Sequence, residues 1–171
     1  DQRIFAIAEA LEKGWTIEKI HKLTKIDIWF LYKMQNIISM KNQIETIKSL
    51  DEMDYELLLD AKKKGFSDFQ IARLIFNPEP KEIEKYQIKV RNHRKSVGIQ
   101  PCIKQIDTLA AEYPSETAYL YATYHGIEND IKHNSKDKTV IVIGSGAYRI
   151  GSSVEFDWCT VSAVNEIRKL G

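Results

Sequence analysis

Cysteine, proline and net charge are all scarce in this sequence, and each shortage excludes a class of protein. The 171 residues include two cysteines and four prolines, and 25 Lys plus Arg balance 24 Asp plus Glu. Cys102 and Cys159 lie far apart and fit neither a disulfide framework nor a pair of metal ligands. A net charge of +1 gives no global attraction to nucleic acid or to an anionic membrane. No apolar run approaches the roughly 18–20 residues of a membrane span, so the composition indicates a soluble protein of the cytoplasm.

The two ends of the sequence are unusual for a complete protein. The chain begins at Asp1 rather than at Met, and it closes at Gly171 directly after a charged stretch with a helical pattern. No signal or transit peptide accounts for such a start. We therefore expect both ends to be cut points within a longer protein, although 43% hydrophobic residues suffice for a packed core.

Residues 1–98 have the apolar periodicity of a series of helices. Thr16 and Asp27 precede two of the periodic segments and can accept hydrogen bonds from the free N–H groups of a first helical turn. Ser67 and Gln70 have the spacing of a capping box. The buried side of the helix that follows Asp27 is expected to consist of Phe30, Met34, Ile37, Ile44 and Ile47.

A weak internal repeat relates two parts of this helical region. Gly14, an aromatic residue and Thr16 precede an apolar helix, and Gly65, an aromatic residue and Ser67 repeat this pattern 51 residues later. Each copy is expected to be a helical hairpin: the first helix of one copy stops at Gly14, and Gly65 suits the left-handed position after the first helix of the other. Lys62 and the two lysines after it then suit the carbonyl end of a helix. Two copies predict paired hairpins and are too few for a solenoid.

The helical period fails after Ile99. Alternating residues up to Tyr124 predict an extended segment, and the polar residues 126–138 predict a surface linker. Thr139–Ile143 is a short β-branched run, typical of a strand buried on both faces, and a helical pattern follows over about 154–169. One strand cannot complete a sheet, so this single βα unit belongs to an incomplete α/β domain. The predicted fold is mainly α.

Three glycines, Gly144, Gly146 and Gly151, lie between the predicted strand and the predicted helix. Such glycines permit a tight turn and a close approach of the backbone to an anion. The third glycine comes too late for the dinucleotide fingerprint, and no Lys-Ser or Lys-Thr of a P-loop follows. A strand-to-helix turn packed against a neighbouring domain is therefore favoured over nucleotide binding. Arg149 and Glu155 are charged residues in this otherwise small and apolar stretch. They are either solvated or joined in a local ion pair, or they face a polar passage or an active site.

Charged residues are unevenly distributed along the chain although they cancel overall. Acidic residues are concentrated at positions 51–60. Positions 81–104 contain seven basic residues and only two acidic ones. With the helix-turn-helix-like repeat, the basic run leaves open an alternative, a nucleic-acid-binding module, beside a solvated helix or a face for an acidic protein partner. The four histidines form no zinc-ligand pattern. The basic residues are Lys81, Lys85, Lys89, Arg91, Arg94, Lys95 and Lys104, and the histidines are His21, His93, His125 and His133.

Distinctive motifs occur in a fixed order at Ile26–Leu31, Gly65–Ala72, Lys104–Tyr124 and Arg149–Cys159. They resemble the corresponding segments of the large chain of carbamoyl-phosphate synthetase, and the resemblance extends over nearly the whole sequence. Ser152, Ser153 and Trp158 follow the eukaryotic pattern of that family. The stretch Gly144–Arg149 is most similar to the multifunctional proteins of the pyrimidine pathway.

The resemblance implies a division into two parts. Residues 1–135 correspond to the family's helical oligomerisation domain, which bridges two synthetase halves, and residues 136–171 correspond to the first βα unit of the second half. The parent enzyme forms carbamoyl phosphate from bicarbonate, glutamine or ammonia, and MgATP, in the pyrimidine or arginine pathway. The implied partners are a second copy of the chain, both synthetase halves and a glutaminase domain or subunit, with no nucleic acid and no membrane.

The resemblance also implies where an internal tunnel passes. In relatives the Arg-Ile-Gly-x-x-x-Glu motif lines a tunnel for carbamate between the two active sites, which assigns Arg149, Ser153 and Glu155 to the tunnel wall. Small side chains keep such a passage open, and charged groups offer polar contacts to an anion. No catalytic, cofactor-binding or metal-binding residue is expected in this segment, and the segment alone is expected to lack synthetase activity.

Overall fold

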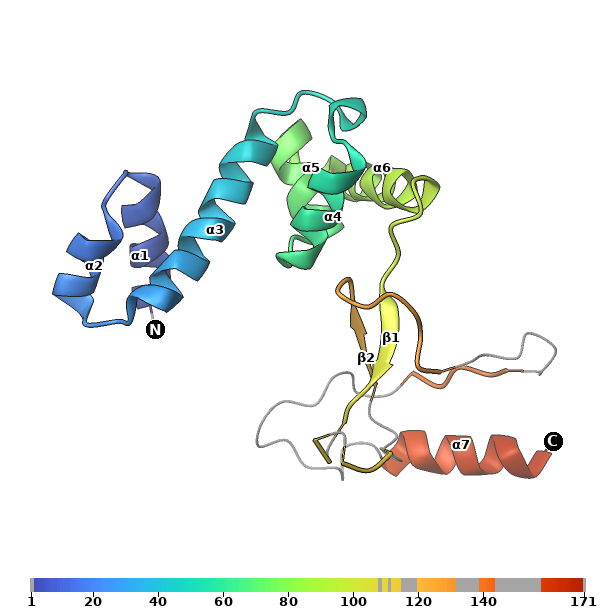
Figure 1. Cartoon of the computed structure of the whole chain (residues 1–171). Coiled ribbons are helices and arrows are strands. Elements are labelled where there is room, and N and C mark those ends of the chain that lie inside the picture. The colour runs from blue at the N-terminus through green and yellow to red at the C-terminus, as the bar shows by residue number, and fades with distance from the viewer. Residues whose placement is uncertain are drawn as a thin grey trace. The chain divides into compact units, whose positions relative to one another are not determined.

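The computed structural model describes residues 2–107, 109–110, 112–114, 120–131, 139–143 and 158–170. The chain divides into two compact units, Asp1–Ile131 and Lys132–Gly171, and each is described by itself. The first unit is mainly helical and contains a small antiparallel sheet (Figure 1). In the part of it that the structure describes, the elements in chain order are α1 (Arg3–Glu12), α2 (Ile17–Thr24), α3 (Ile28–Glu45), η1 (Leu50–Glu52), α4 (Tyr55–Lys63), α5 (Asp68–Phe76), η2 (Pro80–Glu82), α6 (Ile83–Ser96), β1 (Cys102–Gln105) and β2 (Leu120–Thr123).

The prediction of helices over residues 1–98 is confirmed, and side-chain caps fix where several of them begin. Thr16 Oγ1 accepts a hydrogen bond of 3.2 Å from the Lys19 N–H at the start of α2. The Asp27 carboxylate accepts one of 2.8 Å from the Trp29 N–H at the start of α3. Both caps satisfy N–H groups that a first helical turn leaves without partners, as the sequence predicts.

Three helices of the first unit end in the same way, at a glycine with positive φ. Gly14, Gly65 and Gly98 have φ of +79°, +93° and +83° and follow α1, α4 and α6. Each glycine N–H donates to the carbonyl three residues earlier, and the next N–H donates to the carbonyl five residues earlier, at 2.9–3.1 Å. This Schellman ending satisfies the last carbonyls of a helix. The predicted repeat is confirmed as the α1–α2 and α4–α5 hairpins, and Gly98 adds a third such ending.

Two hydrophobic clusters form the core of the first unit, and α3 belongs to both. Leu31, near the start of α3, packs with residues of α1 and α2. Met40 and Ile44, near its end, pack with residues of α4, α5 and α6. The buried members of the smaller cluster are Ile7, Leu11, Ile17, Ile20 and Leu31, and those of the larger one are Met40, Ile44, Ile47, Met53, Leu58, Ala61, Phe66, Ile71, Ala72, Val90 and Ile99.

The predicted buried side of α3 is wrong at two positions. Phe30 and Ile37 are 58% and 46% exposed, whereas Leu31, which was not predicted, is 0% exposed. The prediction assumed one apolar stripe along the whole helix. Because α3 packs against the α1–α2 hairpin near its start and against α5 near its end, its buried face changes between Leu31 and Ile44.

Part of the extended segment forms the sheet, and the polar segment after it covers one sheet edge. β1 and β2 pair antiparallel, with Gln105 opposite Leu120. The Asn129 and Asp130 side chains accept hydrogen bonds from the N–H groups of Ile103 and Gln105 at 2.7 and 2.9 Å. The Asp130 N–H also donates to the Ile103 carbonyl at 2.9 Å. These bonds satisfy backbone groups at the edge of β1 that a third strand would otherwise bind. The described part of the predicted linker therefore belongs to the first unit.

In the second unit the structure describes residues 139–143 and α7 (Trp158–Leu170). The predicted C-terminal helix is confirmed over the residues described. The strand predicted at Thr139–Ile143 does not form, and Ile141 and Ile143 are exposed. A strand requires a second strand to pair with, and in the described part of this unit none is paired with residues 139–143. Among the helices described in either unit, none has the length and apolar character needed to cross a membrane.

Candidate functional site

The three residues that the family resemblance assigns to a tunnel lie outside the described residues. Arg149, Ser153 and Glu155 belong to the range 144–157, in which the turn predicted at the three glycines also lies. Two other features of the first unit bear on function. One is an apolar surface on the first three helices, and the other is a buried ionic cluster where the helices meet the sheet.

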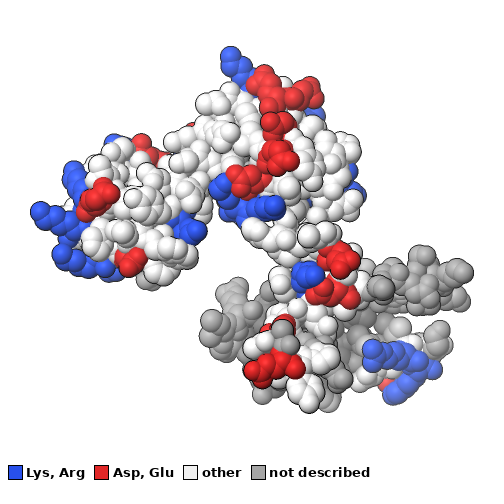
Figure 2. All heavy atoms as spheres, in the orientation of Figure 1, with Lys and Arg blue, Asp and Glu red and all other residues white. Residues whose placement is uncertain are grey.

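The first three helices expose many large apolar side chains. Phe30 and Ile37, seven positions apart along α3, are exposed, as are Ile4 and Phe5 of α1. Figure 2 shows uncharged areas between basic and acidic groups over this part of the molecule. Exposed apolar side chains that adjoin one another are typical of a protein–protein contact, and Phe30 and Ile37 lie on one side of α3 because they are seven positions apart. The α1–α3 apolar surface, as we name it, consists of Ile4, Phe5, Trp15, Leu23, Ile28, Trp29, Phe30, Tyr32 and Ile37.

The acidic and basic runs of the sequence do not form two simple faces. Acidic groups gather over η1 and α4 (Figure 2). In the basic run, Arg94 is buried and Lys104 forms an ion pair with Asp130. Because a nucleic-acid phosphate requires an exposed cation, the run offers fewer such groups than the sequence indicates. No observation favours the nucleic-acid alternative.

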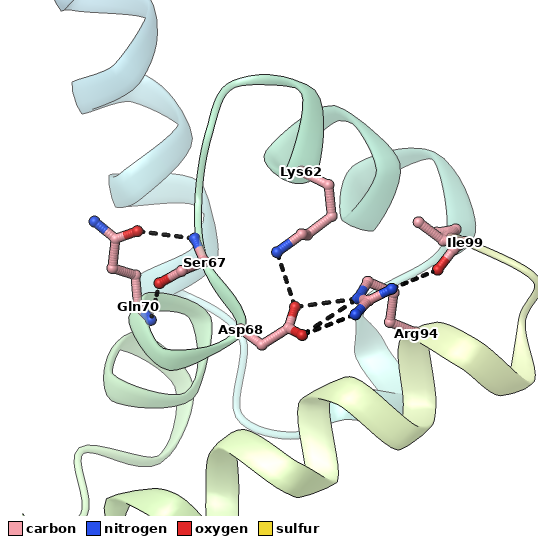
Figure 3. Close-up of polar contacts among 6 residues, drawn as sticks. All are labelled: Lys62, Ser67, Asp68, Gln70, Arg94 and Ile99. Carbon is pink, nitrogen blue, oxygen red and sulfur yellow. Dashed lines mark hydrogen bonds and ion pairs between the residues drawn. The ribbon is translucent and has the colours of Figure 1, made fainter. Parts of the chain in front are cut away.

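Lys62, Asp68 and Arg94 form an ionic cluster that joins α4, α5 and α6 (Figure 3). The Lys62 Nζ lies 2.8 Å from Asp68 Oδ1, and the Arg94 Nη2 lies 3.0 Å from Asp68 Oδ2. Arg94 Nε donates to the two carboxylate oxygens at 3.1 and 3.3 Å, and Arg94 Nη1 donates to the Ile99 carbonyl at 2.8 Å. The Lys62, Asp68 and Arg94 side chains are only 6%, 13% and 9% exposed. The cluster therefore lies almost entirely inside the protein.

The predicted capping box helps to place Asp68 in this cluster. Gln70 N–H donates to Ser67 Oγ at 3.1 Å, and Ser67 N–H donates to Gln70 Oε1 at 2.8 Å (Figure 3). These reciprocal bonds fix the first turn of α5, which begins at Asp68. The carboxylate is thereby held at the helix N-terminus, where a negative charge is favourable.

Sequence reasoning did not find the cluster, although it placed Lys62 correctly near the end of α4. The cluster combines three charged residues from three helices, and no local pattern relates them. The internal repeat carries a signal, because Leu11 and Ile17 stand 51 positions before Lys62 and Asp68 and are both buried. Where one copy of a repeat has buried apolar residues and the other copy has two residues of opposite charge, a buried ion pair is indicated in the second copy.

Tyr124, directly after β2, attaches the sheet to this cluster. Its ring centroid lies 5.1 Å from Lys62 Nζ and 5.5 Å from Arg94 Cζ, which is within the range of cation–π contacts. The ring also packs against the larger hydrophobic cluster. The next residue, His125, has its Nε2 atom 3.1 Å from the Lys63 carbonyl oxygen. The end of β2 is thus held against the helices by an aromatic ring and by a polar contact.

Burial and the two cations act in opposite directions on Asp68. Burial raises the pKa of the carboxyl group, but the hydrogen bonds from Arg94 and Lys62 outweigh it and hold that pKa below its ordinary value. Burial raises the pKa of the Tyr124 phenol. Near neutral pH the cluster therefore contains an ionised carboxylate beside an un-ionised tyrosine ring.

The described residues contain no group of three His, Cys, Asp or Glu side chains that could hold a metal ion. Cys102 Sγ donates to the Gly126 carbonyl at 3.2 Å, and Cys159 is exposed. His21 Nδ1 lies 2.6 Å from the Ile26 carbonyl oxygen. The contact of His21 stabilises a local turn, and the contact of Cys102 joins β1 to the segment that follows β2.

Sequence models of two protein families match the chain. The model described as "Carbamoyl-phosphate synthetase large chain, oligomerisation domain" matches residues 1–98, which contain α1 to α6. The model described as "Carbamoyl phosphate synthase preATP-grasp domain" matches residues 136–171, which contain α7. The first match alone covers more than half of the chain.

Curated relatives are similar over the whole chain. The multifunctional protein pyr1-3 of Dictyostelium discoideum is 47% identical over 171 residues. The arginine-specific carbamoyl phosphate synthase large chain of Eremothecium gossypii is 48% identical over 172 residues, and so is the mitochondrial one of Schizosaccharomyces pombe. Each alignment covers all of this chain, which spans only 7%, 15% and 14% of the three relatives. The chain therefore belongs to the carbamoyl-phosphate synthetase large-chain family, as its motifs predict.

Proposed function

We propose that this chain is part of an enzyme that forms carbamoyl phosphate, and that it connects the two synthetase halves of that enzyme. The order of the family matches carries this proposal, since an oligomerisation domain over residues 1–98 precedes a preATP-grasp domain over residues 136–171. In this proposal residues 1–135 are the bridging domain, and residues 136–171 open the second half. The whole protein uses bicarbonate, MgATP and nitrogen from a glutaminase domain or subunit, or from free ammonia.

Product formation tests this function. We expect the full-length protein to convert labelled bicarbonate into carbamoyl phosphate in the presence of MgATP and either glutamine or ammonia. The isolated 171-residue chain is expected to form none, because the family's ATP-binding domains are not among the domains it matches. Product formation by the isolated chain, or its absence from the full-length protein, would contradict the proposal.

We also infer that the α1–α3 apolar surface mediates self-association. The chain matches an oligomerisation domain, and in the described residues this surface exposes large side chains on all three helices. Fully burying one Phe or Ile side chain stabilises an association by about 1.5–3 kcal/mol before the entropic cost of association. Several such side chains together suffice for a stable contact between two copies.

Charge substitution on this surface tests the inference. Phe30→Glu combined with Ile37→Glu places two carboxylates on one exposed side of α3, and it leaves the two hydrophobic clusters intact. In sedimentation equilibrium the unchanged chain is expected to be a dimer or larger, and the double variant a monomer. Lys81→Glu, an exposed change in η2, is the control and keeps the unchanged mass. A monomeric unchanged chain, or an associated double variant, contradicts the inference.

The tunnel assignment of Arg149, Ser153 and Glu155 is likewise a proposal, supported by the family motif that contains them. We expect Ser153→Phe in the full-length protein to block the passage of carbamate. Bicarbonate-dependent ATP hydrolysis then continues while carbamoyl phosphate formation falls, and Ser153→Ala leaves both rates unchanged. Equal loss of both activities in Ser153→Phe would argue against a tunnel wall at this position.

A cytoplasmic location and a place in the pyrimidine pathway complete the proposed function. The stretch Gly144–Arg149 supports the pyrimidine pathway through its resemblance to multifunctional proteins. The relatives include arginine-specific enzymes of almost equal identity, and the name of one places it in mitochondria. Fractionation of cells, with detection of the full-length protein, tests the location directly.

A further inference from the structure

We propose that Arg94 is a positioning residue that fixes the β1–β2 sheet on the helices. It thereby sets the direction in which the chain continues toward the second synthetase half. This inference rests on the proposed bridging function, because β2 and residues 125–131 lead into the residues that match the preATP-grasp domain. A bridge transmits position only if its parts are rigidly joined, and Arg94 lies at the join between helices and sheet.

Arg94 contacts the chain on both sides of the sheet in sequence, before β1 and after β2, at the end of the sheet where Cys102 pairs with Thr123. Its Nη1 donates at 2.8 Å to the carbonyl of Ile99, three residues before β1. Its guanidinium carbon lies 5.5 Å from the ring centroid of Tyr124, the first residue after β2. Its Nε and Nη2 donate to Asp68 at the start of α5. One side chain of α6 thus joins the chain that enters β1, the chain that leaves β2 and the start of α5.

These contacts require an arginine. The planar guanidinium has five N–H donors in a fixed arrangement, so it can bind a carboxylate along one edge through Nε and Nη2, donate to a carbonyl through Nη1 and lie against a ring at once. A lysine has one ammonium group at the end of a flexible chain. It keeps the positive charge, but it cannot make all of these hydrogen bonds and the ring contact at the same time. Replacement of Arg94 by Lys therefore separates the orientation of the sheet from the neutralisation of Asp68.

Helix packing alone does not explain the cluster. The α1–α2 hairpin is built with Leu11 and Ile17, both buried, where the α4–α5 hairpin has the buried Lys62 and the largely buried Asp68. Buried ion pairs contribute no more to stability than well-packed apolar residues in many proteins. The ionic version differs in having bonds that extend through Arg94 to the sheet, and this difference is what a positioning role requires.

A second set of contacts carries the orientation beyond β2. His125 Nε2 lies 3.1 Å from the Lys63 carbonyl oxygen, next to the cluster. Asn129 and Asp130 then bind along the edge of β1, so the chain is held to the sheet up to the end of the first unit. A sheet that is fixed at Arg94 therefore fixes the point from which the second unit begins.

The test compares Arg94→Lys with Arg91→Lys, an exposed change on the same helix, in the full-length protein. Amide hydrogen exchange of β1 and β2 is expected to become about tenfold faster in Arg94→Lys, with exchange of α5 unchanged. The ATP consumed per carbamoyl phosphate formed is expected to rise at least about twofold, since misplaced halves lose intermediates. Arg91→Lys is expected to match the unchanged protein in both measurements.

Variants of Tyr124 extend the test to the other contact. Tyr124→Leu is expected to reproduce both effects of Arg94→Lys, because it removes the ring that faces the guanidinium. Tyr124→Phe keeps the ring and is expected to restore both measurements to those of the unchanged protein. This rescue by a conservative variant separates positioning from a general loss of stability.

Two results would overturn the positioning role. In one, Arg94→Lys matches Arg91→Lys in the exchange of β1 and β2. In the other, exchange becomes faster while the ATP consumed per product does not change, which would show that the sheet's orientation is irrelevant to the reaction. Failure of the proposed function is distinguishable, because the unchanged protein would then form no carbamoyl phosphate while the exchange measurements still report on Arg94.

Discussion

The α1–α2 and α4–α5 hairpins share a backbone and differ in their interiors. Both turn at a glycine in the left-handed conformation, and a hydroxyl side chain caps the second helix in both. The first hairpin buries Leu11 and Ile17, and the second has the buried Lys62 and the largely buried Asp68 at the corresponding positions. Turn and cap residues therefore determine the hairpin, while its interior can be apolar or ionic. The ionic interior can bind Arg94 from outside the hairpin.

The two hairpins also differ in what covers them. Phe66 in the second turn is 7% exposed, whereas Trp15 in the first turn is 39% exposed. α6 packs on α5 and covers the second hairpin. The aromatic and aliphatic groups of the first hairpin instead contribute to the α1–α3 apolar surface, so the more open copy supplies the proposed contact between chains.

Of the changes considered, removal of the Asp68 carboxylate should lower the free energy of unfolding most, and the first hairpin has no corresponding group. Asp68→Ala leaves two buried cations without their anion, and we expect the free energy of unfolding to fall by about 3–5 kcal/mol. Denaturant unfolding of the 171-residue chain measures this. Replacement of the whole cluster by apolar residues (Lys62→Leu, Asp68→Ile and Arg94→Met) should restore most of the loss. A cost of Asp68→Ala below about 1 kcal/mol would show that the carboxylate is solvated.

Acid should weaken the second hairpin and spare the first. The pKa of Asp68 is lower in the folded chain than its ordinary value, so the stabilisation is present above about pH 4 and is lost as the pH falls through the lower folded pKa. The effect should be smaller than that of Asp68→Ala, since protonation leaves the side chain in place. The slope of stability against pH, measured for the unchanged chain and for Asp68→Asn, reports it. Equal slopes would contradict the prediction.

Substitution of the turn glycines should affect the two hairpins equally. Gly14 and Gly65 have φ of +79° and +93°, and a Cβ added at either position meets nothing within 4 Å. The cost of Gly14→Ala or Gly65→Ala therefore comes from the backbone alone, at roughly 1–2 kcal/mol each. Thermal unfolding of both variants tests this. A markedly higher cost for Gly65→Ala would mean that burial of the turn contributes as well.

Sequence patterns were sufficient where the physical cause is local. The caps at Thr16, Asp27 and Ser67 and the turns of the repeat depend on residues within a few positions, and all were predicted. The exposure of Phe30 and the cluster around Arg94 depend on contacts between distant segments, which no periodicity encodes. The sheet edge covered by residues 126–131 was missed for the same reason, because a polar segment resembles a linker.

The predicted tunnel residues show a different limit. Arg149, Ser153 and Glu155 were assigned through the family resemblance alone, and they lie outside the described residues. Their chemistry is a pair of charges beside a small hydroxyl, which is common on protein surfaces. Composition and spacing cannot distinguish a surface ion pair from a polar passage here. The family motif favours the passage.

The smallest expected effect concerns the third residue after each cap. Gln70 completes the capping box of α5, because its side-chain oxygen accepts from the Ser67 N–H. Its counterpart in α2, Lys19, has a side chain that can only donate, and the Lys19 Nζ lies 3.6 Å from the Trp15 ring centroid. Gln70→Lys should therefore cost about 0.5–1 kcal/mol. Lys19→Gln gains a box but loses a cation–π contact of similar size at a partly exposed ring, so its net effect should be close to zero. Denaturant unfolding of both variants measures this asymmetry, and a gain in Lys19→Gln as large as the loss in Gln70→Lys would show that the contact with Trp15 contributes nothing.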